Sequence, residues 1–122
     1  WREGVRQFLD TCCYGGRNGV AVLSVDEQQM LFQRLSEESF RTFRTRQRRL
    51  FEGILESFGI APEPDRVDLF INLSLAVIVL SRAIPQTLPM FVPDAAREST
   101  AFQIRCIVVW LESLREQPGE QR

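Results

Sequence analysis

The chain has 122 residues, of which 44% are hydrophobic and 25% are charged, and its formal net charge is −1. This balance is typical of a folded domain and excludes the low-hydropathy, high-charge composition of disordered chains. A nearly neutral chain also has no overall field that would attract it to nucleic acid or to an anionic membrane. We therefore expect one domain, residues 1–122, with its own hydrophobic core.

Residue types that carry catalysis are scarce. The sequence has no His and three Cys, which are Cys12, Cys13 and Cys106. The lack of His excludes Ser-His-Asp and Cys-His nucleophiles and His-containing zinc sites, and three Cys without paired CxxC motifs do not form a closed zinc site. An enzyme would need carboxylate or Cys chemistry, and no paired carboxylates fall on a buried face. We expect a protein that is not an enzyme, with no catalytic residue, metal site or cofactor.

The cysteines and the apolar runs also indicate a compartment. An odd number of Cys is no disulfide framework and is typical of the reducing cytoplasm. The longest apolar run, Leu75–Leu80, is far shorter than the roughly 20 residues that span a bilayer. We expect a cytoplasmic protein without a membrane partner. Because the chain begins with Trp1 and not with Met, we also expect that an upstream part is missing.

The first helix is predicted over Trp1–Tyr14, where apolar residues recur on one helical face. Gly15–Gly19 should end it as a turn. A phosphate-binding loop is disfavoured there, because neither a following Lys with a hydroxyl residue nor a GxGxxG pattern is present. Val20–Leu23 is predicted to be helical or irregular. Ser24, with Glu27 three residues later, is a capping box that predicts a second helix.

A long amphipathic helix is predicted over Phe40–Phe58, after a break at Ser36–Ser39 and before a C-terminal Gly59. Its other face is basic and carries Arg41, Arg44, Arg46, Arg48 and Arg49. A basic run can bind nucleic acid, but this one lacks interleaved aromatics and the chain is slightly acidic. We favour a solvated face whose arginines pair with Glu37, Glu38, Glu52 and Glu56.

The central stretch, Asp65–Ile84, is apolar on nearly every face, so a helix built from it must be buried. Asn72 and Ser74 interrupt it and would need a polar partner inside the protein or from a ligand. The connection that follows is spaced by prolines and apolar. It is predicted to pack on the core, with a gate over a cavity as the alternative.

The last helix is predicted over Asp94–Leu114, with more apolar surface than one contact uses. The helix at Phe40–Phe58 and this last helix can each shield one side of Asp65–Ile84. We expect a remaining side of Asp65–Ile84 to meet a second copy across a two-fold axis. The predicted fold class is all-α, a bundle of about five to six helices whose last two long helices form a dimer interface.

Three stretches together resemble the C-terminal domain of TetR-family transcriptional regulators: Arg17–Leu23, Phe40–Ile60, and the acidic linker into Asp65–Ile84. The resemblance covers almost the whole chain. It implies a homodimer that senses a small apolar or amphipathic effector as part of a bacterial repressor. The helix-turn-helix typical of that family is absent here, so DNA binding is expected only through a missing N-terminal domain.

The resemblance also implies where each contact would form. The dimer interface would use apolar residues of the last two helices, namely Leu69, Leu73, Ala76, Leu80, Ile104, Ile107, Val108 and Leu111. The ligand would lie between the Phe-rich helix and the central helix, near Phe40, Phe43, Phe51, Phe58, Phe70, Asn72, Ser74, Met90 and Phe91. An alternative function is a helical protein–protein interaction domain with a hydrophobic groove for a partner helix.

Overall fold

The computed structural model describes residues 1–14, 25–83 and 90–116, and these residues form an all-α fold. Its elements in chain order are α1 (Arg2–Tyr14), α2 (Val25–Arg34), α3 (Glu37–Ser57), α4 (Pro64–Ala83), the 3₁₀ turn η2 (Pro93–Ala95) and α5 (Ala96–Glu116). The predicted all-α class is confirmed, and each predicted helix corresponds to an observed one. The predictions for Gly15–Gly19, Val20–Leu23, Ser24 and the first part of the proline-spaced connection lie outside the described residues.

The ends of α3 are fixed by local chemistry. The helix begins at Glu37, inside the break predicted at Ser36–Ser39, and its end before Gly59 is as predicted. Ser36 is the N-cap, and its hydroxyl accepts a hydrogen bond of 3.1 Å from the backbone N–H of Ser39. At the other end Gly59 has a φ of 81°, a left-handed conformation that glycine adopts without a Cβ clash. The N–H of Ile60 then donates to the carbonyl of Leu55 at 3.0 Å and closes the helix.

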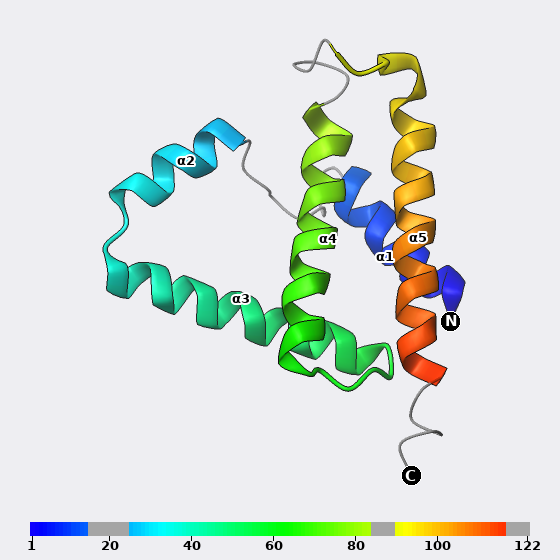
Figure 1. The fold of residues 1–122 in the computed structure, drawn as a ribbon, viewed down its shortest axis with the longest axis horizontal. Coiled ribbons are helices and arrows are strands. Elements are labelled where there is room, and N and C mark those ends of the chain that lie inside the picture. Colours follow the sequence, from blue (N-terminus) through cyan, green and yellow to red (C-terminus); the bar gives the residue numbers. More distant parts are fainter. Residues whose placement is uncertain (15–24, 84–89, 117–122) are drawn as a thin grey trace.

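The core lies where α1, α4 and α5 meet and where the C-terminal half of α3 crosses α4 (Figure 1). Its largest fully buried side chains include Phe70, Leu9, Leu55 and Leu111, one from each of these four helices. Burying a side chain of this size stabilises a fold by roughly 1.5–3 kcal/mol. The core therefore depends on all four helices, and α2 contributes none of these residues.

Three side-chain contacts fix the start of α1 against the end of the bundle. The indole Nε1 of Trp1 donates to the carbonyl oxygen of Phe58 at 2.7 Å, and the guanidinium of Arg115 lies 4.8 Å from the centre of the Trp1 ring. Arg2 forms a two-pronged ion pair with Glu112 of α5. These contacts link three helices that are far apart in sequence.

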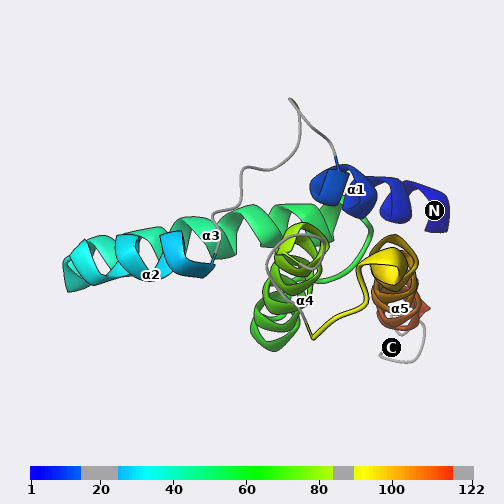
Figure 2. The ribbon, with the colours of Figure 1, turned by 90° about the horizontal axis from the view of Figure 1, so that it is seen from above.

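Helices α4 and α5 lie side by side and run antiparallel, as Figure 1 shows. Seen from above, α1 and α3 both lie on one side of this pair, and no described helix covers the other side (Figure 2). The fold thus has one helical layer, α4 and α5, whose second side is left open.

The remaining part is an arm made of α2 and the N-terminal half of α3, which extends away from the bundle (Figures 1 and 2). The ring of Phe32 in α2 packs edge-on against Phe40 and Phe43 of α3, with 5.5 Å between ring centroids in both pairs. This aromatic contact holds α2 on α3.

Candidate functional site

The structure separates the predicted ligand-binding aromatics. Phe51 and Phe70 pack edge-on at 5.5 Å between α3 and α4, where they belong to the core. Phe58 packs on Phe8 of α1 at 5.6 Å. Phe40 and Phe43 lie in the arm, as described above. Three of these five side chains thus pack in or on the core and the other two lie in the arm, so they are not gathered at one site.

The apolar connection before α5 is exposed where the structure describes it. Met90 is 93% exposed, Phe91 46% and Val92 66%, so the prediction that this connection packs on the core is wrong for these three residues. The backbone N–H of Ala95 donates to the carbonyl of Val92 at 3.2 Å, which turns the chain into α5 before these side chains reach the bundle.

The two polar residues of α4 differ in their surroundings. Asn72 is exposed, so water satisfies its amide. Ser74 is only 2% exposed, and its hydroxyl has no hydrogen-bond partner among the described residues. The predicted need for a polar partner therefore stands only at Ser74.

We call the exposed and half-buried apolar residues of α4 and α5 described in this paragraph the outer face. On α4 its members are exposed or half-buried, and they are the four predicted there: Leu69, Leu73, Ala76 and Leu80. On α5 the exposed members are Phe102, Cys106 and Val109, which follow one another at intervals of four and three residues. They lie one turn apart on the side of α5 opposite its buried stripe.

The predicted α5 half of the dimer interface needs a correction. Ile104, Ile107, Val108 and Leu111 are buried in the core of a single chain, where they face α1 and α4. A second copy cannot reach them without opening the bundle. Their apolar spacing marks the inner side of α5, and the outer face uses the opposite side of the helix.

The three cysteines fall into two classes. Cys106 is exposed in the outer face, whereas Cys12 and Cys13 are buried. Burial raises the pKa of both buried thiols, although a hydrogen bond with Ser81 acts in the opposite direction on Cys13. The buried pair is thus held as thiols in the core and does not resemble a reactive site.

The basic side of α3 forms fewer ion pairs than predicted. Arg48 pairs with Asp68 of α4, with 3.0 Å between Nε and Oδ1, and Arg44 donates to Gln47 at 2.8 Å. No described arginine of α3 pairs with the predicted glutamates. The ion pair of Arg48 instead reaches another helix, because the side of α3 that carries this arginine faces α4.

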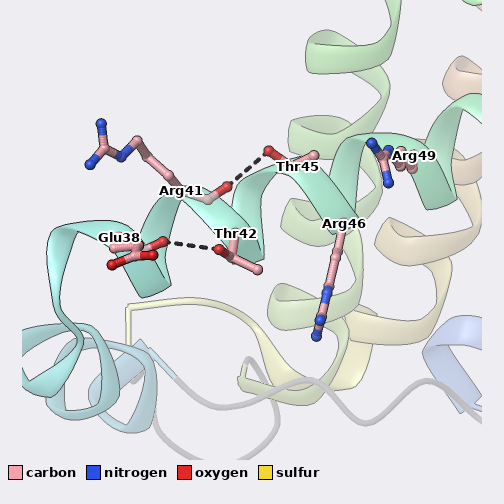
Figure 3. Close-up of a pocket in the computed structure, with 6 residues that line it drawn as sticks. All are labelled: Glu38, Arg41, Thr42, Thr45, Arg46 and Arg49. Atoms are coloured by element: carbon pink, nitrogen blue, oxygen red, sulfur yellow. Dashed lines mark hydrogen bonds between the residues drawn. The ribbon is translucent and has the colours of Figure 1, made fainter.

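A shallow, open surface depression of about 410 Å³ runs along α3, and all the residues that line it are exposed. Six residues line it, as Figure 3 shows: Glu38, Arg41, Thr42, Thr45, Arg46 and Arg49. The hydroxyl of Thr42 donates to the backbone carbonyl of Glu38 at 3.1 Å, and that of Thr45 donates to the carbonyl of Arg41 at 3.0 Å. The sequence predicts one basic face that includes all five arginines. In the structure Arg44 and Arg48 contact Gln47 and Asp68, whereas Arg41, Arg46 and Arg49 form no ion pair with the described residues, and this difference depends on the packing of α3.

The described part of the chain holds no group of three or more Cys, Asp or Glu side chains placed to bind a metal ion. None of the described helices has the length and hydropathy needed to cross a membrane.

Comparisons with known proteins leave the family open. No family model matches the chain, and neither curated proteins nor solved structures give a significant match.

Proposed function

We propose that the chain is the dimerisation and effector-sensing domain of a bacterial transcriptional regulator, and that two copies associate through the outer face. The observation that supports this proposal is the apolar, uncovered side of α4 and α5. Exposed apolar surface on neighbouring elements is typical of an interface between proteins. The resemblance to TetR-family domains, in which the last two long helices pair, points to the same two helices.

The shape of the outer face suits a two-fold contact. Two antiparallel helices from each copy would form a four-helix arrangement in which each residue meets the equivalent surface of its partner. Ala76 has a small side chain near the middle of α4, which allows the helices to approach closely. Phe102 and Val109 would then supply the large apolar contacts from α5.

In this proposal an effector acts by favouring one arrangement of the dimer over another. A ligand can shift such an equilibrium only if it binds the two arrangements with different affinity. DNA binding would be carried by another part of a longer protein and would respond to the spacing of the two copies.

Sedimentation equilibrium of a matched pair of variants tests the dimer. Val109 in the outer face and Leu50 on α3 are both 62% exposed, so Val109→Glu and Leu50→Glu place a carboxylate at equally open positions. The wild type and Leu50→Glu should be dimers at tens of micromolar, and Val109→Glu should be a monomer. A monomeric wild type, or a dimer that only Leu50→Glu breaks, would contradict the proposed interface.

Cys106 provides a second test on the unchanged protein. Its thiol is exposed in one copy, whereas Cys12 and Cys13 are buried, so a bulky maleimide should modify Cys106 first. If the outer face is the interface, modification should slow as the protein concentration rises and the dimer forms. A rate that does not depend on concentration would place Cys106 outside the contact.

The arm favours a second candidate function, a domain that binds an amphipathic partner helix. Met30, Leu31, Phe43 and Leu50 are all exposed on α2 and α3, and apolar side chains spaced along helices can receive such a ligand. Titration with an amphipathic helical peptide would show binding that Leu50→Glu weakens. Binding that Val109→Glu weakens instead would assign the peptide to the outer face.

A further inference from the structure

One face of α3 presents exposed apolar side chains beside a basic one. Phe43, Arg46, Leu50 and Gly53 follow one another at intervals of three, four and three residues, so they share a face of the helix, which we call the α3 stripe. Leu50 is 62% exposed, and Phe43 is 41% exposed although its ring also contacts Phe32 of α2. The stripe is therefore open to a partner.

Gly53 is the residue of the α3 stripe that a single chain explains least. It lies inside a helix, where glycine is less favourable than Ala, and its backbone does not adopt the left-handed conformation that favours glycine. A Cβ at this position would meet no atom within 4 Å, so the fold has room for a larger residue. What the missing side chain does provide is a place where the backbone of another helix can approach closely.

The charge around the α3 stripe is positive. Residues 39–51 contain five arginines and no Asp or Glu. Arg46, in the middle of the stripe, forms no ion pair with the described residues. A guanidinium between two exposed apolar side chains is matched by a surface that places carboxylates beside apolar residues.

We propose that the α3 stripe binds an acidic amphipathic helix of another protein. This inference rests on the second candidate function, the binding of a partner helix, and it specifies the charge of that helix and the residues that it meets. Phe43 and Leu50 are seven residues apart, or about 10.5 Å along the axis, so they fit apolar side chains two turns apart on the partner. Carboxylates beside those side chains would face Arg46, and Gly53 would allow the two helices to pack closely.

A second copy of the chain fits the α3 stripe less well. In a two-fold contact centred between Phe43 and Leu50, the two copies of Arg46 would lie close together and repel each other. The outer face differs in this respect, because none of its members is charged. A nucleic acid would match the arginines, but its phosphate backbone would leave Leu50 without an apolar contact.

Fluorescence anisotropy with three synthetic peptides tests the proposal on the full chain. Each peptide has about 21 residues, enough to be helical in water, and carries Leu at the a and d positions of its heptads. The e and g positions carry Glu in one peptide, Gln in the second and Lys in the third. At about 150 mM salt we expect the Glu peptide to bind about fivefold more tightly than the Gln peptide and about tenfold more tightly than the Lys peptide.

Four variants assign the binding to the α3 stripe. Leu50→Glu and Arg46→Glu should each weaken binding of the Glu peptide by about tenfold, and Arg46→Glu should strengthen binding of the Lys peptide. Arg41→Glu is the matched control, because it makes the same change in charge on the same helix while Arg41 and Arg46 point to different sides of α3 (Figure 3). It should bind within about twofold of wild type. Gly53→Gln should weaken binding without lowering stability in urea, since the fold has room for a side chain there.

Other outcomes would overturn the proposal. These are the absence of binding of the Glu peptide at about 1 mM, an equal loss in Arg41→Glu and Arg46→Glu, and binding of a short DNA duplex through Arg46 while the Glu peptide does not bind. Equal binding of all three peptides that still depends on Leu50 would also overturn the acidic partner, but it would leave the second candidate function in place. Sedimentation of Arg46→Glu reports the dimer independently of these results.

Discussion

Replacing Ser74 with Ala should stabilise the fold, because the buried hydroxyl of Ser74 lacks a hydrogen-bond partner among the described residues. The other two buried hydroxyls are bonded: Ser81 donates to the carbonyl of Ile78 at 2.7 Å, and Thr100 donates to that of Ala96 at 3.0 Å. All three hydroxyls lose contact with water on folding. Ser74 is the one of the three that gains no hydrogen bond from the described residues in its place.

The magnitude follows from two terms. An unsatisfied buried polar group costs about 1–3 kcal/mol, and Ala is a better helix former than Ser by a few tenths of a kcal/mol. Removing one oxygen atom leaves little empty space, so the loss of packing is small. Ser74→Ala should therefore raise the free energy of unfolding by about 1–2 kcal/mol. For a chain of this size the melting temperature should rise by about 3–6 °C for each kcal/mol.

Urea unfolding followed by circular dichroism measures this change, and Ser81→Ala is the matched control. That variant removes a hydroxyl that is bonded, so it should lower the free energy of unfolding by about 0.5–1 kcal/mol. If Ser74→Ala is destabilising by a similar amount, the hydroxyl has a partner that one chain does not supply, and the reasoning fails. Dimer formation must be held constant by measuring both variants at one protein concentration.

Three further predictions concern other contacts. The hydrogen bond from Arg2 holds the pKa of Glu112 below its ordinary value of 4.5. This contact therefore stabilises the fold above about pH 4.5, and the stabilisation is lost as the pH falls through the lowered pKa. In thermal melts from about pH 3 to 7, the melting temperature of Glu112→Gln should fall less on acidification than that of the wild type. Phe32→Ala should detach α2, since an isolated helix of 10 residues is marginal in water, and hydrogen exchange should then show lost protection in α2 but not in α4. The half-exposed pair Arg48–Asp68 should give a coupling of only about 0.2–1 kcal/mol in a double-mutant cycle with Ala.

Local sequence signals were enough to place the helices. Gly59 ends α3 as predicted, because left-handed backbone is decided by a few neighbouring residues, whereas the N-cap at Ser36 starts the helix three residues before the predicted Phe40. The burial of α4 followed from its composition, since a helix that is apolar on nearly every face has to be covered. These predictions needed no information about distant contacts.

The orientation of α5 could not be predicted in the same way. Its inner stripe includes Ile104 and Leu111, and its outer side carries Phe102 and Val109, so apolar residues occur on both sides. Periodicity finds two apolar sides and does not say which of them meets α1 and α4. That choice depends on how the helices pack, which local spacing does not encode.

The basic side of α3 shows the same limit for charged residues. The spacing of Arg41, Arg44 and Arg48 places them on one face of a helix, but in the structure Arg48 forms an ion pair with Asp68 of another helix. The partner lies 20 residues away, and a pattern within one helix cannot identify it. The group that remains unpaired is therefore defined by tertiary packing.

The length of α3 has a mechanical consequence. Leu55 is fixed in the core near one end, and the capped start of the helix at Ser36 is about 19 residues away, or roughly 28 Å at 1.5 Å per residue. A tilt of about 5° at the Leu55 pivot would displace the far end, together with α2, by roughly 2.5 Å. The helix can thus act as a lever that converts a small adjustment inside the bundle into a movement comparable to the width of an atom at its tip.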